Sequence, residues 1–297
     1  MPAKPFVKWA GGKGQLIPQL EVLFPGDLSG AEDLTYVEPF VGGGAMLFHV
    51  LSKYPNIKRA VINDVNGRLV NAYRTVRDHP KDVVADLLGM QSEYLALPDL
   101  KHKEHYYLDR RDEYNSMCDS SRVRLASLFI FLNKTCFNGL HRVNRAGRFN
   151  VPFGKSGKPT ICDSGTIYED SRILQNVEIS SMDFERVFDD IGGNVFVYFD
   201  PPYRPLPKTK SFLSYAKEGF GDGEQRRLSD LCRKLDGRGF KWLLSNSDPH
   251  NTDPEDMFFD DLFMDFEVLR VSASRMINSN GKGRGKITEI AVRNYCF

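Results

Sequence analysis

The sequence predicts an α/β protein in which a sheet of β-α-β crossovers is interrupted by a mostly helical insertion. Three observations favour this fold. Strand-like apolar runs alternate with helical patterns on both sides of the chain's middle. A glycine-rich turn, residues 42–44, follows the first run and precedes a helical segment. Between residues 66 and 164 helical periodicity dominates, which predicts a domain made of residues 1–65 and 165–297 around an inserted domain.

The predicted strands are apolar runs bounded by turn residues. They lie at residues 35–37, 59–62, 195–199, 241–244, 267–271 and 287–292. A Ser/Asn/Gly-rich loop joins the last two, which could form an antiparallel pair. In the insertion, apolar residues recur at helical spacing, as at Val83, Leu87 and Leu88 and at Leu125, Leu128, Phe129 and Leu132. A Gly/Asn/Arg-rich stretch then predicts a basic hairpin that ends near Gly154.

Composition indicates an ordinary globular protein. The chain has 297 residues, of which 41% are hydrophobic and 27% charged. No apolar run approaches the roughly 20 residues that span a bilayer, and no signal peptide is evident. The five cysteines are scattered without CxxC spacing, which argues against a disulfide framework and a zinc site. We therefore expect a reducing cytoplasm and no metal. We also expect the protein to be a monomer in solution.

The distribution of charge favours a polyanionic partner, although the net charge is only +1. Residues 134–158 carry six Lys or Arg and no acidic residue, and residues 268–288 carry five more basic residues and no acid. Such stretches are typical of a nucleic-acid-binding face. Solvated basic loops are the alternative for either stretch alone.

The sequence Asp200-Pro201-Pro202-Tyr203 is the most informative motif. It ends the apolar run 195–199, because two prolines cannot donate ladder hydrogen bonds. The rigid turn presents a carboxylate and a proline carbonyl beside an aromatic ring. These groups suit a planar amino group, whose two protons they can accept while Tyr203 stacks on its ring.

Two further motifs indicate a small ligand. The glycine turn at 42–44 lacks the third glycine of a dinucleotide fingerprint, and Asp64 ends the second strand, where it can accept hydrogen bonds from ribose hydroxyls. This combination favours an adenosine compound without phosphates, of which S-adenosylmethionine is the obvious one. The loop at residues 8–13 is not a phosphate loop, and its Trp9 and Lys13 could fold over a zwitterion.

These blocks, in this order, resemble the Dam family of DNA adenine-N6 methyltransferases. The resemblance spans nearly the whole chain. It comprises KWAGGK at 8–13, EPFVGGGA at 38–45, Asn63-Asp64, FNGLHRVN…GRFNVPFGK at 137–155, Asp183-Phe184 and DPPY at 200–203. It implies a Rossmann-like methyltransferase sheet that uses S-adenosylmethionine, with an inserted target-recognition domain that bears a β-hairpin. It also implies a protein of the bacterial cytoplasm or nucleoid, or a phage-encoded one.

The resemblance also implies roles for individual residues. The catalytic motif is Asp200, Pro201, Pro202 and Tyr203. Asp183 and Phe184 are expected to recognise the adenine of the cofactor. The full set of expected cofactor residues is Trp9, Ala10, Gly11, Lys13, Glu38, Pro39, Phe40, Asp64, Asp183, Phe184 and Asp200. The segment from Arg204 to Gly223, with Tyr215 and Phe220, is expected to form a flap over a base flipped out of the helix.

The block at 137–155 resembles the recognition hairpin of family members that methylate GATC. The implied DNA-binding residues are Lys8, Lys134, Phe137, Asn138, Leu140, Arg142, Asn144, Pro152 and Lys155. Arg142 is suited to a guanine edge, and Leu140 and Pro152 to a thymine methyl group. The sequence departs from the most familiar pattern at Phe137, His141 and Lys155, where Tyr, Cys and Arg are often found.

Four alternatives to adenine methylation in GATC stay open. The same amino-methylation chemistry could act on another DNA sequence, on cytosine N4, or on adenine in RNA. A catalytically silent DNA-binding module with this fold is the fourth. The occupied cofactor positions speak against that last alternative.

Overall fold

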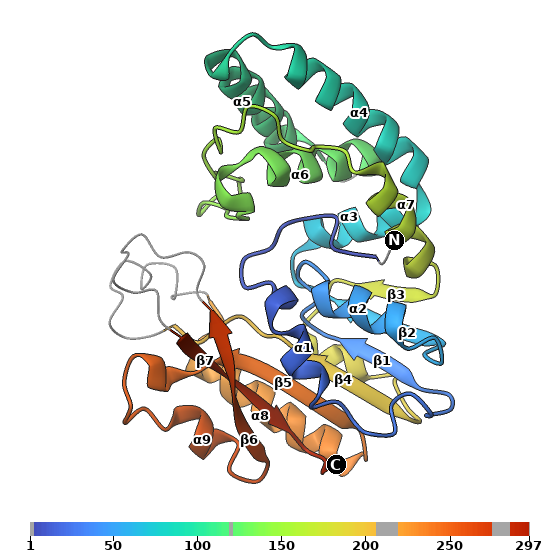
Figure 1. Ribbon diagram of the computed structural model, residues 1–297, viewed down its shortest axis with the longest axis vertical. Helices are drawn as coiled ribbons and strands as arrows, with labels where there is room; N and C mark the ends of the chain where they lie inside the picture. The colour runs from blue at the N-terminus through green and yellow to red at the C-terminus, as the bar shows by residue number, and fades with distance from the viewer. Residues whose placement is uncertain (1–2, 119–120, 206–218, 275–285, 297) are drawn as a thin grey trace. The chain divides into compact units, whose positions relative to one another are not determined.

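The computed structural model describes residues 3–118, 121–205, 219–274 and 286–296. Its described strands form one seven-stranded sheet in the order β3-β2-β1-β4-β5-β7-β6 (Figure 1). β1 pairs in parallel with β2 and β4, and β4 with β5, whereas β7 is antiparallel to β5 and β6. The strands are β1 (Thr35–Glu38), β2 (Arg59–Asn63), β3 (Val177–Ser180), β4 (Val195–Phe199), β5 (Lys241–Ser247), β6 (Glu267–Ser274) and β7 (Lys286–Arg293). The predicted α/β class is therefore confirmed, as is the antiparallel pair at the end of the chain.

Helices occupy most of the chain between these strands. The α-helices are α1 (Ile17–Glu21), α2 (Ala45–Lys53), α3 (Gly67–Asp78), α4 (Pro80–Ala96), α5 (Leu100–Ser116), α6 (Arg122–Thr135), α7 (Ser164–Leu174), α8 (Asp222–Gly237) and α9 (Phe258–Leu262). The 3-10 helices are η1 (Lys13–Gln15), η2 (Phe137–Gly139), η3 (Phe184–Phe188) and η4 (Pro249–Asn251). All six predicted strands are present, but β3 was not predicted. It has only four residues and two apolar side chains, which is too short a run to be distinguished from a loop.

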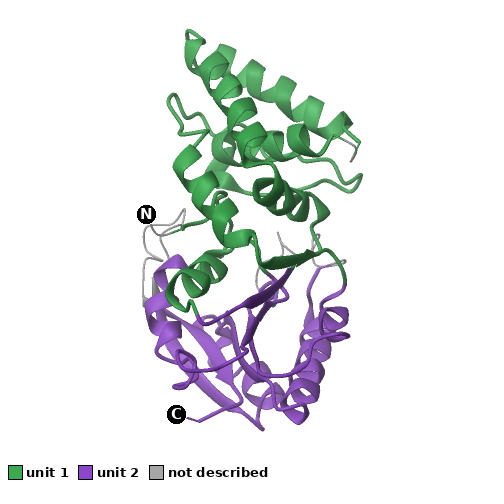
Figure 2. Cartoon of the chain, turned by 90° about the vertical axis from the view of Figure 1, so that its right-hand side faces the viewer, with its two compact units in different colours: residues 1–13, 41–55, 63–182 green, residues 14–40, 56–62, 183–297 purple. Residues whose placement is uncertain are grey.

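The chain divides into two compact units (Figure 2). Unit 1 comprises residues 1–13, 41–55 and 63–182, and unit 2 comprises residues 14–40, 56–62 and 183–297. The predicted insertion, 66–164, lies within unit 1, which also contains residues from the N-terminal part of the chain. The predicted boundaries of the catalytic domain, 1–65 and 165–297, stay a prediction.

Unit 2 is built around the central strands of the sheet. Apolar residues of β1, β4, β5 and β7 pack against the apolar faces of α8 and α9 and against η3. Trp242 of β5 is fully buried there, with the ring of Phe266 4.7 Å away in an edge-to-face arrangement. This core fixes the carboxyl ends of β1 and β4, from which the site residues of unit 2 extend.

Unit 1 is organised around α6. Ten of its fourteen residues are buried, because α3, α4 and α5 all pack against it. The N-terminus of α3 is capped by Asn66, whose side chain accepts hydrogen bonds from the N–H groups of Arg68 and Leu69. The segment that follows α6 therefore starts from a rigid, buried helix.

Residues 137–155 form the predicted hairpin, but almost without a ladder. Only two isolated antiparallel bridges occur in it, at Cys136–Phe153 and Val143–Phe149. Side chains of α5 hold the returning strand instead: Asn115 exchanges two hydrogen bonds with the backbone of Phe149, and Tyr107 donates to the carbonyl of Val151 at 2.8 Å. The conformation of the hairpin thus depends on the core of unit 1.

Tyr107→Phe is expected to destabilise the protein by about 1–3 kcal/mol, because it leaves the buried carbonyl of Val151 without its donor. Urea unfolding followed by circular dichroism would measure the change. Tyr168→Phe, at a tyrosine of α7 that is 45% exposed, is the matched control and should change the unfolding midpoint little. Equal stability of the two variants would contradict a supporting role for the Tyr107 hydroxyl.

Candidate functional site

The turn at 200–203 lies in unit 2, directly after β4. Because β1 and β4 are parallel neighbours, Glu38 and Asp200 follow the same edge of the sheet. The ring of Tyr203 is 39% exposed, and its hydroxyl donates to Glu289 Oε1 at 2.8 Å. A carboxylate and an aromatic ring are therefore presented together beyond the end of a buried strand.

Two side chains that the sequence did not single out hold this turn. Gln225 in the first turn of α8 donates from Nε2 to the carbonyl of Pro202 at 3.0 Å, and its own Oε1 accepts from Asn246 at 3.2 Å. Both amides are almost fully buried. Arg204, the residue after the motif, pairs with two carboxylates at 2.7 Å each. The turn is fixed from both sides, which preorganises the groups that precede it.

Glu38 is a buried acid of unit 2 whose pKa is strongly shifted. It is 2% exposed, and its Oε2 has no hydrogen-bond partner among the described residues. Burial raises the pKa of Glu38 well above its usual value, and the nearby charge of Asp200 acts in the same direction, whereas the Tyr36 phenol opposes them. Glu38 therefore favours its protonated form.

An aromatic cluster in unit 2 includes the ring of Phe184, from the predicted Asp183-Phe184 pair. The rings of Phe40, Phe184 and Phe220 lie with centroids 5.3 to 5.7 Å apart. The guanidinium of Arg227 lies 4.9 Å from the centre of the Phe184 ring and pairs with both carboxylate oxygens of Asp183, at 3.0 and 3.1 Å. The predicted pair of Asp183 and Phe184 is thus joined to Phe40 by ring packing, and Arg227 orients its acid.

In unit 1, Trp9 lies against the glycine turn. A Cβ atom at Gly42 would come within 2.9 Å of the indole, and one at Gly43 within 2.8 Å of the Trp9 Cβ, so both positions require glycine. The N–H of Gly42 donates to Asp64 Oδ2 at 3.1 Å, and its carbonyl accepts from the hydroxyl of Tyr73 at 3.0 Å. Three predicted blocks, at 8–13, 42–44 and 63–64, therefore meet in this unit.

Asp64 is held by backbone donors. Burial raises the pKa of Asp64, while the N–H groups of Asn66 and Gly42 oppose this shift. Lys13 is 3% exposed, although it is a lysine. The other predicted cofactor residues of unit 1 are the exposed Ala10 and Gly11 beside the half-buried Trp9. In unit 2, the predicted cofactor residue Pro39 is buried.

The DNA-binding residues predicted from the sequence all lie in unit 1. Those that are exposed are Lys8, Phe137, Asn138, Arg142, Asn144, Pro152 and Lys155. Leu140 and Lys134 are half-buried, and burial lowers the pKa of Lys134, with Lys8 acting in the same direction. The guanidinium of Arg142 donates to the side chain of Asn150 at 2.8 Å and to its carbonyl at 3.0 Å. Arg142 is therefore held in one orientation on an exposed surface.

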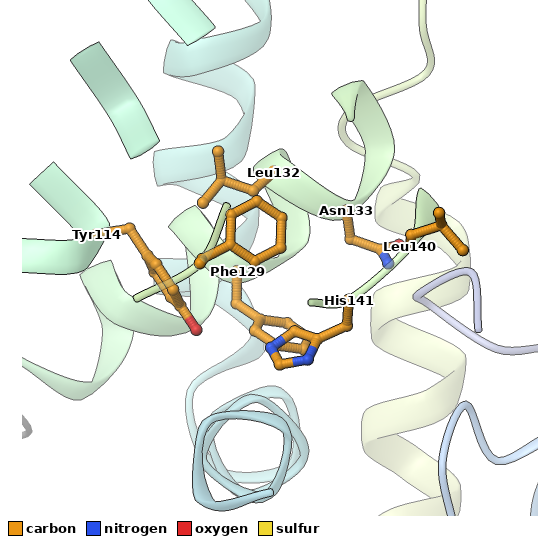
Figure 3. Close-up of a pocket in the computed structure, with 7 residues that line it drawn as sticks. Tyr114, Phe129, Leu132, Asn133, Leu140 and His141 are labelled. Atoms are coloured by element: carbon orange, nitrogen blue, oxygen red, sulfur yellow. The ribbon is translucent and has the colours of Figure 1, made fainter. Parts of the chain in front are cut away.

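A shallow hollow beneath the hairpin is lined mainly by rings. Figure 3 shows the imidazole of His141 over the ring of Phe129, and Asn133 beside Leu140. Burial lowers the pKa of His141 to about 4, so its imidazole is neutral near pH 7. Its Nδ1 lies 3.4 Å from Asn66 Nδ2, which can only donate, so the ring proton belongs on Nε2.

Several expectations concern residues outside the described part of the chain. Most of the predicted flap, including Tyr215, falls in residues 206–218, and much of the second basic stretch falls in residues 275–285. Among the described residues, no group of three or more His, Cys, Asp or Glu could hold a metal ion. No helix within the described ranges is long and apolar enough to cross a membrane. The five cysteines are free thiols.

The chain is similar to several known DNA methyltransferases. A family model described as D12 class N6 adenine-specific DNA methyltransferase matches residues 9–277. The chain is 45% identical to the type II methyltransferase M.MjaIII of Methanocaldococcus jannaschii, over 99% of this chain and 100% of that protein. It is 38% identical to a type II methyltransferase of Lactococcus lactis, over 98% and 95% of the two chains. A DNA adenine methylase of Vibrio cholerae is 32% identical, over 96% and 94%.

Glu38→Gln is expected to stabilise the protein increasingly as the pH rises. The folded-state pKa lies above the ordinary 4.5, so the folded state binds more protons than the unfolded state. Wild-type stability then falls from about pH 4.5 up to the folded pKa, by at most about 1.4 kcal/mol per pH unit, whereas the neutral amide does not titrate.

Urea unfolding of both proteins at pH 5, 6, 7 and 8 measures this difference. Glu255→Gln, at an exposed glutamate of unit 2, is the control. If the difference in unfolding free energy between Glu38→Gln and the wild type stays constant with pH, Glu38 ionises normally in the folded protein and the prediction is wrong.

Proposed function

Because this chain belongs to the D12 class of N6 adenine-specific DNA methyltransferases, we propose that it uses S-adenosylmethionine to methylate the N6 of an adenine flipped out of GATC in double-stranded DNA. One observation carries the proposal. The Asp200–Tyr203 turn is held rigidly at the end of β4, with a carboxylate and a ring presented together. No metal takes part in the proposed reaction.

The chemistry follows from the electronic state of the amino group. The N6 lone pair is delocalised into the adenine ring, so it is a poor nucleophile. Asp200 and the carbonyl of Pro201 accept hydrogen bonds from its two N–H groups, which localises the lone pair on nitrogen. The nitrogen then attacks the sulfonium methyl carbon in line, the carbon–sulfur bond breaks, and its electrons remain on sulfur. The methylated nitrogen, now positively charged, releases one proton to solvent and becomes the neutral N6-methylamino group. Preorganised groups of this kind lower a barrier by about 3–4 kcal/mol each.

The state of Glu38 supports the role of Asp200. Two ionised carboxylates side by side repel each other, and the buried Glu38 relieves this repulsion by keeping its proton. Asp200 can then remain an acceptor of hydrogen bonds. Gln225 fixes the carbonyl of Pro202, which sets the direction of the preceding peptide and of the Pro201 carbonyl.

The cofactor residues divide between the two units. In unit 1, Asp64 accepts hydrogen bonds from the ribose hydroxyls, and the loop of Trp9, Ala10, Gly11 and Lys13 covers the methionine moiety. In unit 2, Asp183 and Phe184 recognise the adenine, Phe40 packs beside it, and Glu38 and Pro39 contribute further cofactor contacts. The aromatic cluster and the Arg227–Asp183 pair support this assignment, since they place apolar rings beside an acid that is held by an ion pair.

The hairpin supplies the sequence preference. Arg142 pairs with a guanine edge, for which its fixed orientation is an advantage. Lys8 contacts the first guanine, and Leu140 and Pro152 contact a thymine methyl group. Phe137 and Asn138 enter the duplex near the flipped base, and Lys134, Asn144 and Lys155 hold phosphates. Tyr203 stacks on the flipped adenine, which is worth roughly 1–3 kcal/mol.

One experiment separates this function from the alternatives. The chain is expressed in a host that lacks DNA methylation, and N6-methyladenine and N4-methylcytosine are mapped by sequencing the host DNA. The proposal expects N6-methyladenine confined to GATC. N6-methyladenine in another motif would overturn GATC as the target sequence but keep the reaction. N4-methylcytosine would overturn adenine as the methylated base, and unmodified DNA would favour the silent binding module.

Asp200→Ala is expected to lower kcat by at least about 10²–10³-fold, since it removes one preorganised acceptor of an N6 proton. Methyl transfer from radiolabelled cofactor to a duplex measures the rate, and gel shift measures DNA affinity, which should stay within about tenfold because DNA affinity comes mainly from phosphate contacts. Asp190→Ala, at an exposed aspartate of unit 2 away from the turn, is the control for loss of one negative charge. Full turnover in Asp200→Ala would remove this residue from the reaction.

Arg142→Ala is expected to lower discrimination at one base pair by about 1–3 kcal/mol and to affect other positions little. Methylation of a set of duplexes with every single substitution in the target measures the preference at each position. Arg145→Ala, at an exposed arginine of the same hairpin, is the matched control and should reduce activity evenly. An even loss in Arg142→Ala as well would make Arg142 a phosphate contact.

A further inference from the structure

We propose that His141 is a positioning residue that couples cofactor occupancy at the Trp9 loop to the conformation of the DNA-reading hairpin. The inference rests on the proposed function and goes beyond it, since it assigns a role to a residue that contacts neither substrate. It also predicts a property of the protein, namely that cofactor and DNA strengthen each other's binding through this side chain.

The first observation is a closed ring of contacts within unit 1. Asp64 accepts from the N–H of Gly42, Gly42 packs on the indole of Trp9, and Trp9 stacks on His141 at 5.7 Å with 20° between the ring planes. His141 then accepts from Asn66 at 3.4 Å, and the N–H of Asn66 donates to the other oxygen of Asp64 at 2.8 Å. Four members belong to the cofactor side of the unit, and only His141 belongs to the hairpin.

The second observation is how firmly His141 is held in the hairpin. Its ring lies 5.6 Å from that of Phe129 on α6 and 5.7 Å from that of Phe149 on the returning strand. Phe149 is fixed in turn by its two backbone hydrogen bonds to Asn115. A shift of the imidazole therefore has to move the hairpin or open this packing.

The third observation is a parallel connection one residue before Trp9. Asn133 is 4% exposed and accepts from the N–H of Lys8 at 2.7 Å. Its Nδ2 donates to the carbonyl of Lys8 at 2.8 Å and to that of Gly139 at 3.0 Å. A Cβ atom at Gly139 would come within 2.6 Å of the Lys8 side chain. The cofactor loop and the start of the hairpin thus share one buried amide, which limits how the stack above them can move.

These contacts make a definite physical connection between two ligand sites. A cofactor that packs on Trp9 and binds Asp64 restricts two members of the ring, and the imidazole has to follow them. Ordering the imidazole orders the hairpin, so less entropy is lost when DNA binds. Reciprocity requires DNA to tighten the cofactor by the same factor. Neutral His141 suits this role, because a charged ring would be costly to bury against three aromatic rings.

The test measures this coupling in the full-length protein. Calorimetry gives the Kd of S-adenosylhomocysteine alone and with a saturating duplex that carries the target found by sequencing. The ratio of the two values is expected to be at least about fivefold in the wild type, as is typical for coupled sites. In His141→Cys, which removes the stacked ring, the ratio should fall below about twofold. In His105→Cys, at an exposed histidine of α5, it should equal the wild-type ratio.

His141→Phe keeps a stacked ring and provides a second variant should His141→Cys fail to fold, as a melting curve would reveal. It should retain a ratio within about twofold of the wild type. A wild-type ratio of one, an undiminished ratio in His141→Cys, or a lost ratio in His141→Phe would overturn the inference. A wild type that binds no S-adenosylhomocysteine would instead contradict the proposed function.

Discussion

Close packing between Trp9 and the glycine turn is the constraint on which unit 1 depends. The turn passes the indole at a distance that leaves no room for a Cβ atom at Gly42 or Gly43. Because the turn lies there, the N–H of Gly42 points at Asp64 and offsets part of the cost of burying that carboxylate. A side chain on the turn would therefore displace the tryptophan and the acid together. Glycine here is required by crowding as much as by backbone conformation.

In unit 2, the main constraint is that two acidic side chains lie near each other. Parallel strands bring the polar residues at their carboxyl ends together, which is useful for binding but places Glu38 beside Asp200. Full burial of Glu38 raises its pKa and favours its protonated form, which lessens the repulsion between the two acids. The same rigid edge that crowds the acids also fixes the turn after Asp200 through Gln225. The arrangement of the parallel strands thus determines both the charges and the geometry at the proposed reaction centre.

The sequence predicted the elements whose signal is local. Each apolar run of the sheet except the short β3 was recognisable, and the two prolines marked the end of β4. Gln225, Asn66 and Asn133 were not recognised as supports, because a single polar residue in a helix or turn gives no periodic signal. Their partners lie 23, 75 and 125 residues away, at Pro202, His141 and Lys8. Such pairings are decided by the fold as a whole and become visible only in three dimensions.

In the hairpin at residues 137–155, the side chains that fix its conformation differ from those that face outward. Along its returning strand, Phe149, Val151 and Phe153 are buried, while the residues between them face outward. With only isolated bridges in place of a ladder, the buried residues and the side chains of α5 determine its course. The outward residues take little part in this buried support, although Asn150 also accepts hydrogen bonds from Arg142. The turn at 200–203 belongs to the other unit and depends on different supports, Gln225 and Arg204. A substitution on the outward side of the hairpin therefore need not disturb the proposed catalytic turn.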